Sequence, residues 1–336
     1  MYLPAEWHEQ EFVQLTWPHK ETDWADIFDE VVDCYCDMTR EIAARERLLI
    51  AAQHPDEVTR HLKEHNVTSD NIVIAECENN DTWARDHAFI SCIEDGRRLL
   101  MDFTFNGWGL KFASNLDNQI NKRLHSTGAI KGDYVSCLDF VLEGGSIESD
   151  GNGTLLTTST CLLAPNRNDT MTKEDIEHYL IQRFNARRVL WLNHSWLAGD
   201  DTDGHVDTVA RLCPNNAIAY VQCTDRDDEH FAELDAMEKE LKEMKTLDGR
   251  PYTLIPLPLP DACTWEGDRL PATYANFLIV NNAVLYPTYN QKENDETAAI
   301  QLSKAFPGYE IVGIDCRPLI KQHGSLHCCT MQYPKV

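Results

Sequence analysis

The sequence has few basic residues for its many acidic ones, and it has no long apolar run. Its 30 lysines and arginines face 55 aspartates and glutamates, a net charge of −25, which argues against nucleic acid and anionic membranes as partners. No stretch approaches the ~18 consecutive apolar residues of a membrane-spanning helix. Residues 1–6 lack the basic and apolar regions of a signal peptide. We therefore expect a cytoplasmic protein, and the acidic charge suits a small cationic ligand.

Paired cysteine motifs are also missing. The 12 cysteines are scattered and form no C-x-x-C knuckle, so they indicate neither a zinc site nor a disulfide framework. In a reducing compartment most of them would serve as small buried apolar side chains. No Pro/Gly/Ser-rich linker or low-complexity tract divides the 336 residues, 43% of which are hydrophobic. The sequence predicts one catalytic domain spanning residues 1–336, and the number of subunits stays open.

One order of elements recurs along the chain: a hairpin, an amphipathic helix and a buried strand. The hairpins are predicted at residues 88–103, 141–157, 205–221 and 277–286, and a fifth would pair a final strand, 328–333, with the first strand, 12–17. The predicted helices cover residues 24–42, 57–64, 116–124, 172 onward, 229–243 and 293–306, and the buried strands cover 48–51, 72–74, 189–192, 252–255 and 311–314. Five such units, closed by the two ends of the chain, predict an α/β ring around a central axis.

The residues whose side chains are best suited to catalysis stand at the heads of these hairpins. They are Asp86, Glu143, His205 with Asp207, Asn276 and Cys328. A ring would bring the five heads together, which predicts a single site on the central axis.

A thiol, an imidazole and several carboxylates on separate segments indicate nucleophilic catalysis. The number of acids distinguishes this set from a cysteine protease, whose site needs oxyanion donors. Ionised acids beside a nucleophile would hold a planar cation, best a guanidinium. A guanidinium keeps its proton at any physiological pH (pKa above ~12), so its carbon must be attacked while charged. A thiolate suits that role, provided that the cation or a histidine lowers the pKa of the thiol from ~8.5.

Several of these acids also have a structural interpretation. Asp86 follows Arg85 and could form a surface ion pair, and Glu143 begins a tight Glu-Gly-Gly turn. The acids of residues 200–207 could form a solvated or calcium-like loop, although no glutamate closes it at the EF-hand spacing. His205 and Asp207, two positions apart, would point to the same side of a strand.

The cysteines and tryptophans also have structural interpretations. Cys328 and Cys329 would point to opposite faces of the final strand, so at most one of them can line the site. Trp83, Trp108 and Trp265 would by default be aromatic residues of the core or its rim. Two rival functions remain: a metal-dependent hydrolase with His205, Asp203 and Asp207 as ligands, and a binding protein without catalysis.

Six ordered motifs between residues 4 and 334 resemble the agmatine deiminases, which are grouped with the bacterial-type peptidyl-arginine deiminases. The motifs are Pro4-Ala5-Glu6-Trp7 with Thr16-Trp17-Pro18, Trp83-Ala84-Arg85-Asp86, Phe105-Asn106-Gly107-Trp108-Gly109, Leu142-Glu143-Gly144-Gly145-Ser146-Ile147, Gly199-Asp200-Asp201-Thr202-Asp203-Gly204-His205-Val206-Asp207 and His327-Cys328. The resemblance covers the whole chain.

This resemblance implies a five-bladed pseudo-symmetric α/β propeller of the pentein type, in the guanidine-modifying superfamily. It implies hydrolysis of agmatine to N-carbamoylputrescine and ammonia, a step of polyamine (putrescine) biosynthesis, through a covalent amidino-thioether and without metal or cofactor. Carried over by motif, Cys328 is the nucleophile, His205 the general acid and base, Asp86 and Asp207 the guanidinium clamps, and Glu143 the acid that orients His205. The same motifs assign substrate binding to Trp83, Trp108 and Asp203, and the separate stretch Thr273-Tyr274-Ala275-Asn276-Phe277 resembles a site-lining segment that adds Asn276.

The chain also departs from the family pattern. Glu148 stands where a histidine commonly follows the Gly-Gly-Ser-Ile motif, and His87-Ala88 replaces Gly-Pro after Asp86. The approach to the nucleophile is Gln322-His323-Gly324-Ser325 instead of a glycine-rich run. These changes concern the tail of the substrate, so deimination of peptidyl or free arginine to citrulline remains the alternative. An extra acid such as Glu148 would favour an amine tail like that of agmatine.

Overall fold

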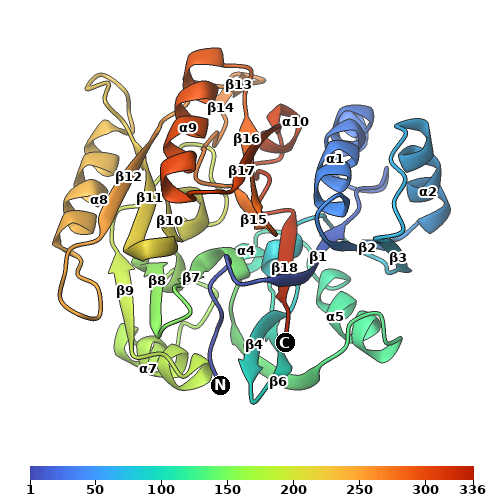
Figure 1. Ribbon diagram of the computed structural model, residues 1–336, viewed down its shortest axis with the longest axis horizontal. Helices are drawn as coiled ribbons and strands as arrows, with labels where there is room; N and C mark the ends of the chain where they lie inside the picture. The colour runs from blue at the N-terminus through green and yellow to red at the C-terminus, as the bar shows by residue number, and fades with distance from the viewer.

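The computed structural model describes residues 1–336 as a mixed α/β structure, with its strands inside and its longer helices around them (Figure 1). The mixed α/β prediction is confirmed. None of the helices combines the length and the apolar character that crossing a membrane requires.

Five sheets share one pattern: an antiparallel pair followed by a strand in parallel. Their strand orders are β18-β1-β2-β3, β4-β5-β6, β7-β8-β9, β10-β11-β12 and β15-β16-β17. The strands are β1 Gln10–Thr16, β2 Arg47–Ala52, β3 Ile72–Glu76, β4 Ile90–Glu94, β5 Arg97–Thr104, β6 Asp133–Val141, β7 Ile147–Ser149, β8 Thr154–Thr158, β9 Arg188–Leu192, β10 Ala210–Cys213, β11 Ala217–Gln222, β12 Thr253–Pro258, β15 Leu278–Val280, β16 Ala283–Thr288, β17 Glu310–Asp315 and β18 Thr330–Pro334, and β13 (Thr264–Trp265) pairs with β14 (Asp268–Arg269).

Local sequence signals explain the longer helices and the hairpins. The helix α7 begins with a capping box, in which the side chain of Thr172 accepts the N–H of Asp175 and the Asp175 carboxylate accepts the N–H of Thr172. In the β4–β5 hairpin both turn residues, Asp95 and Gly96, have positive φ, as a type I′ turn requires. The helices are α1 Phe28–Ala43, α2 Pro55–Glu64, α3 Ala84–His87, α4 Gly107–Leu110, α5 Asp117–Ser126, α6 Ser159–Leu162, α7 Lys173–Phe184, α8 Phe231–Glu243, α9 Lys292–Ala305 and α10 Arg317–Ile320.

The first and last strands lie side by side, as predicted. Strand β18 runs antiparallel to β1, which is parallel to β2 on its other edge. The rings of Phe12 and Tyr333 stack across this pair with their centroids 4.3 Å apart. In Figure 1 the blue β1 and the red β18 cross the middle of the molecule, so the last strand is anchored in the interior.

Three strands were missed by the sequence analysis: β6 and the short pair β13 and β14. Strand β6 pairs in parallel with β5, but most of its side chains are exposed or half-buried. Its apolar residues Tyr134 and Leu138 are 40% and 51% exposed, so apolar residues lie on the exposed face too and hide the alternation by which a strand is recognised.

Short turns precede the first strand of each sheet, and this corrects three predicted strand boundaries. Asp86 lies in α3, before β4, and Glu143 precedes the 3-10 turn η2 (Gly144–Ser146), before β7. His205 and Asp207 lie at the 3-10 turn η3 (Val206–Thr208), whereas the strand β10 begins only at Ala210. Cys328 likewise lies in a turn, two residues before β18. The residues expected on strands are therefore presented by tight turns.

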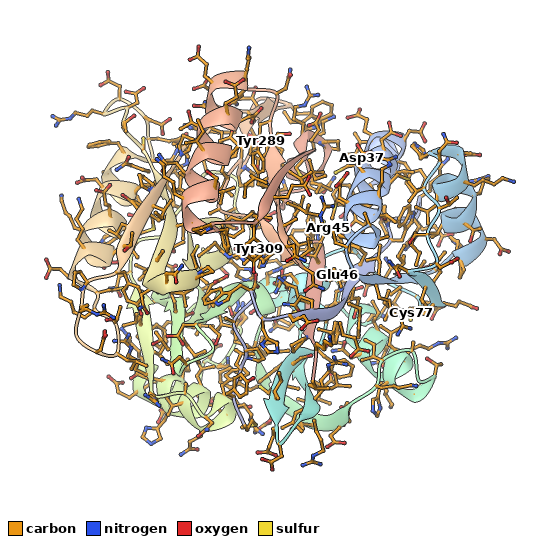
Figure 2. All side chains as sticks on the ribbon, viewed as in Figure 1. Asp37, Arg45, Glu46, Cys77, Tyr289 and Tyr309 are labelled. Carbon is orange, nitrogen blue, oxygen red and sulfur yellow. The ribbon has the colours of Figure 1, made fainter.

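Adjacent sheets are tied together by polar contacts at their outer ends. Glu46, marked in Figure 2, accepts the N–H of Asn281 at 2.8 Å and so links the start of β2 to the turn between β15 and β16. Burial raises the pKa of Glu46 to about 7. The neighbouring Arg45 forms ion pairs with Glu41 and with Glu310 at the start of β17. These contacts hold the β1–β2 sheet against the β15–β17 sheet.

Candidate active site

The carboxylate of Asp86 is buried and held from two sides. Its Oδ1 accepts the N–H of Gly145 at 3.1 Å, and its Oδ2 accepts the indole N–H of Trp108 at 3.0 Å. Burial raises the pKa of Asp86 to about 6, against the lowering effect of nearby His205. Asp86 is therefore a fixed anion above this pH, ready to receive a cation.

Trp108 reaches Asp86 from an unusual turn. Gly107, Trp108, Gly109 and Leu110 have φ values of 68°, 56°, 85° and 67°, a single left-handed helical turn. For the two L side chains this conformation costs roughly 1–2 kcal/mol each. The turn is closed by Asn106, whose side chain accepts the N–H of Gly109 at 2.9 Å. Backbone strain of this kind concentrates at functional sites.

The ring of His205 is completely buried, and neither of its nitrogens has a hydrogen-bond partner within the protein. Its Nδ1 lies 3.7 Å from Asp86 Oδ1. Burial lowers the pKa of His205, but Asp86, Cys161 and Glu143 together outweigh this effect, and the pKa lies well above its ordinary value. The ring is therefore an imidazolium at neutral pH, able to donate a proton.

The carboxylate of Asp207 has one bound and one free oxygen. Oδ2 accepts a hydrogen bond from Nδ1 of His327 at 2.7 Å, while Oδ1 is buried without any partner. Burial raises the pKa of Asp207, but the hydrogen bond and charge of His327, with the charge of His205, bring it below its ordinary value. Asp207 thus stays ionised and keeps an oxygen for a further donor.

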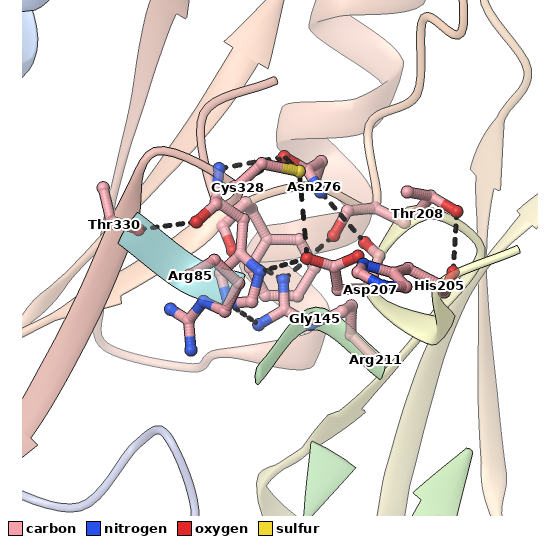
Figure 3. A network of polar contacts seen from close by, with 12 residues as sticks. Arg85, Gly145, His205, Asp207, Thr208, Arg211, Asn276, Cys328 and Thr330 are labelled. Atoms are coloured by element: carbon pink, nitrogen blue, oxygen red, sulfur yellow. Dashed lines mark hydrogen bonds and ion pairs between the residues drawn. The ribbon is translucent and has the colours of Figure 1, made fainter. Parts of the chain in front are cut away.

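The thiol of Cys328 lies beside Asp207. Its Sγ is 4.0 Å from Asp207 Oδ2 and 3.4 Å from the side-chain oxygen of Asn276 (Figure 3). That oxygen also accepts the backbone N–H groups of His327 and Cys328, so Asn276 fixes the turn that carries the thiol. Burial, Asp207 and Asp86 raise the pKa of Cys328 well above its ordinary value. The thiol is protonated when no cation is bound.

Gly145 shows how closely these groups converge. A Cβ at this position would lie 2.6 Å from His205 Nδ1, 3.0 Å from Asp86 Oδ1 and 3.1 Å from Asp207 Oδ2. Three hairpin heads thus meet at one glycine, on the turn that carries Glu143. The structure brings Asp86, His205 and Asp207 together, and Cys328 contacts Asp207.

Glu143 is buried beside His205 but bonded to another residue. Its carboxylate accepts Arg167 Nε at 2.9 and 3.2 Å, and both side chains are fully buried. Ligand atoms of Glu143, Cys161 and His205 lie within 4.8 Å of one another. Glu143 can therefore act on His205 through its charge, while Arg167 holds it in place.

Asp203 does not line the site. Its two carboxylate oxygens accept hydrogen bonds from Lys111 and Arg167, each at 2.7 Å. This placement does not support the expectation that Asp203 contacts substrate. It also argues against the rival metal-dependent hydrolase, which would need Asp203, His205 and Asp207 as joint ligands. Asp203 is instead bonded to Lys111 and Arg167.

A cavity of about 150 Å³ leads to the thiol. Of the predicted residues, Trp83, Asp86, Trp108 and Cys328 line it, whereas His205, Asp207 and Asn276 are buried behind it. The remaining lining residues are Asp23, Asp81, Phe112, Asp201, Thr202, Gln322, His323 and Gly324. A Cβ at Gly324 would lie 2.2 Å from the Trp83 ring, so only glycine lets this indole form the wall.

Trp265 and Cys329 lie outside this cavity. Trp265 is 42% exposed and lies under the ammonium of Lys321. Cys329 is fully buried beside Tyr35. Only one of the two adjacent thiols therefore reaches the cavity, in agreement with the sequence analysis, although the pair lies on a turn and not on a strand.

A buried charged network behind Cys328 was missed by the sequence analysis. Its members are Glu6, Arg85, Glu148, Arg211 and His327. The only signals were the positions of Glu6, Arg85 and His327 within the family motifs, and none of them predicts a contact.

The placement of Glu148 corrects the expectation that it selects an amine tail. Its carboxylate is bonded to Arg211 Nε and to the N–H of Leu212, away from the cavity. The charge of Glu148 is therefore matched within the protein. Asp201 and Asp23 line the cavity, but the sequence analysis gave neither of them a role.

Three comparisons relate the chain to known proteins. The model of the Porphyromonas-type peptidyl-arginine deiminase family matches residues 2–334. A protein of Marinomonas sp. (strain MWYL1) named "Putative agmatine deiminase" is 33% identical, over 99% of this chain and 94% of that protein.

Two solved structures are also similar. The "Putative Arginine Deiminase from Porphyromonas gingivalis" has 50% identity and a TM-score of 0.93, and the match covers 99% of this chain and 98% of that chain. A C. jejuni agmatine deiminase with a cysteine-to-serine substitution and bound substrate has 39% identity and a TM-score of 0.91, and covers 99% and 95% of the two chains.

Proposed function

Because this chain belongs to the Porphyromonas-type peptidyl-arginine deiminase family, we propose that it is an agmatine deiminase. The reaction is hydrolysis of the guanidino group of agmatine to N-carbamoylputrescine and ammonia. The agmatine deiminases among its relatives and structural neighbours support an enzyme that acts on guanidino C–N bonds. The choice among guanidino substrates rests on the cavity.

The acidic charge of the cavity favours agmatine among these substrates. Apart from Asp86, its lining includes Asp23, Asp81 and Asp201 but no lysine or arginine. A carboxylate tail, as in free arginine, would need a cation to bind it, whereas these acids suit an ammonium tail. Agmatine has a guanidinium at one end and an ammonium at the other.

Asp86 and Asp207 form the clamp for the guanidinium. Asp86 Oδ1 and Oδ2 are oriented by Gly145 and Trp108, and Asp207 Oδ1 is free to accept an N–H of the substrate. Trp83 and Trp108 flank the planar group as walls of the cavity. Two carboxylates at fixed positions hold the guanidinium plane with its carbon exposed to Cys328.

The bound cation generates the nucleophile. Asp86 and Asp207 raise the pKa of Cys328 while the site is free, and a guanidinium between them offsets both charges, so the thiol releases its proton to solvent. The Sγ thiolate attacks the guanidinium carbon. The bond from this carbon to a terminal nitrogen breaks, and His205 donates a proton so that the nitrogen leaves as ammonia. A covalent amidino-thioether remains on Cys328.

Water completes the reaction. Neutral His205 takes a proton from a water molecule, whose oxygen attacks the amidino carbon. The C–S bond then breaks, which releases the ureido product and regenerates the thiolate. Glu143, 0% exposed and adjacent to His205, stabilises the imidazolium between the two steps. One histidine thus serves as acid and then as base.

Assays of ammonia and ureido product test this proposal on three substrates: agmatine, free arginine and a peptide with a C-terminal arginine. We expect the highest kcat/KM for agmatine. Faster turnover of arginine or of the peptide would replace the proposal with its alternative, a citrulline-forming deiminase. Tight binding of agmatine without ammonia release would indicate a binding protein.

Further parts of the proposal concern the molecule as a whole. We propose that the five sheets are the blades of a pentein-type α/β propeller around the site, and that residues 1–336 form one catalytic domain. All 12 cysteines are free, which suits a cytoplasmic enzyme of polyamine biosynthesis. Light scattering would measure the molar mass in solution and so show whether identical subunits assemble.

A further inference from the structure

His327 connects the guanidinium clamp to the N-terminal segment. We propose that His327, held by Glu6, is a positioning residue that fixes the rotation of the Asp207 carboxylate and aims its free oxygen at the substrate. The inference rests on the proposed function, because it concerns how the same site binds a guanidinium.

The bond between His327 and Asp207 has a defined direction. Nδ1 of His327 lies 2.7 Å from Asp207 Oδ2, and a carboxylate with a lowered pKa only accepts hydrogen bonds. Nδ1 therefore carries a proton whether the ring is neutral or charged. Both side chains are buried, with relative exposures of 1% and 0%, so no water competes for this bond.

The other ring nitrogen lies between Glu6 and Arg211: it accepts from Arg211 when the ring is neutral and donates to Glu6 when the ring is charged. Nε2 of His327 lies 2.9 and 3.0 Å from the two Glu6 oxygens and 3.0 Å from a terminal nitrogen of Arg211. Glu6 is in turn bound by Arg85 at 3.0 Å and by Gln332 at 3.1 Å. The imidazole is thus held at both ends, and the ring cannot rotate without losing contacts on both sides.

The contact with His327 determines where the free oxygen of Asp207 points. Oδ1 is buried without a partner, a state that is unfavourable until a donor arrives. A carboxylate with only one restrained oxygen keeps its plane only while that restraint is present. If His327 no longer binds Oδ2, Asp207 can turn toward other donors, and the substrate loses one of its two anchors. The loss affects ground state and transition state alike, so it raises KM more than it lowers kcat.

Two substitutions of His327 separate its two contacts. The side-chain amide nitrogen of His327→Asn takes the place of Nδ1 and can still donate to Asp207, whereas that of His327→Gln takes the place of Nε2 and reaches only Glu6. We expect His327→Gln to raise the KM for agmatine about tenfold or more, the loss of one hydrogen bond to a charged group. We expect His327→Asn to keep KM within about threefold of the unaltered protein.

Calorimetric binding of agmatine provides a readout without chemistry. In the Cys328→Ala background, His327→Gln should raise the dissociation constant by the same factor as it raises KM. His327→Asn should leave the dissociation constant close to that of Cys328→Ala alone. Glu6→Ala should weaken binding less than His327→Gln does, since Arg211 still contacts Nε2 of the ring. The control His125→Asn alters a half-buried histidine that contacts Gly132, and it should change neither constant.

The inference would be overturned if both His327 variants bound agmatine equally well. It would also be overturned if His327→Gln lowered kcat at an unchanged dissociation constant, because the change would then act on the adjacent Cys328. Absence of ammonia from the unaltered protein with every guanidine would instead overturn the proposed function. Thermal denaturation of each variant identifies any loss of binding that is due to unfolding.

Discussion

Trp108→Phe isolates one hydrogen bond to the guanidinium clamp. The substitution keeps an aromatic ring in the cavity wall, where Trp108 packs edge-on against Phe105 at 4.9 Å, and removes only the N–H that binds Asp86 Oδ2 at 3.0 Å. Asp86 then loses a donor that favours its ionised form. We expect its pKa to rise.

The size of the shift follows from the burial of this pair. A hydrogen bond to a charged group contributes about 1.5–3 kcal/mol, and Asp86 is too buried for solvent to replace it. Since 1.36 kcal/mol corresponds to about one pKa unit, the pKa of Asp86 should move from about 6 upward by about one to two units. The carboxylate would then be protonated near neutral pH.

The pH dependence of kcat/KM for agmatine measures this shift, because it reports groups of the free enzyme. Asp86 binds the guanidinium only when ionised, so activity is lost as the pH falls through its pKa. Raising this pKa moves the acidic limb to higher pH, and the variant loses most activity near neutral pH and least at alkaline pH.

A matched control is Trp191→Phe, which removes an indole N–H donated to Glu177 at 2.8 Å. This variant should keep the acidic limb of the unaltered protein. An unchanged limb in Trp108→Phe would refute the reasoning, since it would mean that Asp86 does not govern the limb or that the indole does not stabilise its charge. A fall in kcat/KM by the same factor at every pH would equally contradict it.

Two more substitutions test the site. Cys328→Ala should abolish ammonia release, whereas Cys329→Ala, in the buried position beside Tyr35, should retain turnover and lose only stability; activity lost in the second variant alone would identify Cys329 as the nucleophile. Gly145→Ala would place a methyl 2.6 Å from His205 Nδ1 and should lower kcat/KM about 100-fold, as displacements near 1 Å do, which steady-state kinetics would show; near-normal activity would mean that the three groups do not meet there during catalysis.

Features that depend on neighbouring residues could be predicted from the sequence. The Thr172–Asp175 capping box and the Asp95-Gly96 turn are each specified within four residues, and the structure contains the helix start and the hairpin that they indicate. The pairing of the first and last strands was inferred from their patterns and from the recurring units. Strand β6 was missed because its exposed face carries apolar residues such as Leu138, which hides the alternation.

The predicted site residues share a position in the fold, but their local conformation was not predictable. His205 and Cys328 lie on turns because backbone bonds between nearby residues, Thr208 N–H to His205 C=O and Thr330 N–H to His327 C=O, close the chain before each strand. An alternating sequence cannot show where such a turn ends and the strand begins. Their convergence nevertheless followed from the recurring order of elements.

The partners of the buried acids could not be predicted. Arg167 holds Glu143 and Asp203, and Arg211 holds Glu6 and Glu148. Each pair joins segments far apart in sequence, and nothing around either arginine distinguishes it from a surface residue. The placements of Asp203 and Glu148 do not fit the expectations that Asp203 binds substrate and that Glu148 favours an amine tail, since both expectations were made without knowing which cations lie beside these acids.

The contact between the two ends of the chain also affects how the protein folds. Glu6 and His327 lie 321 positions apart, so closing this contact orders a very long loop, and contacts between distant residues tend to make folding slow. Helices and hairpins, whose contacts are local, can form earlier. During refolding the thiol would reach its acids only in the final steps, and catalytic activity would recover after most secondary structure is already present.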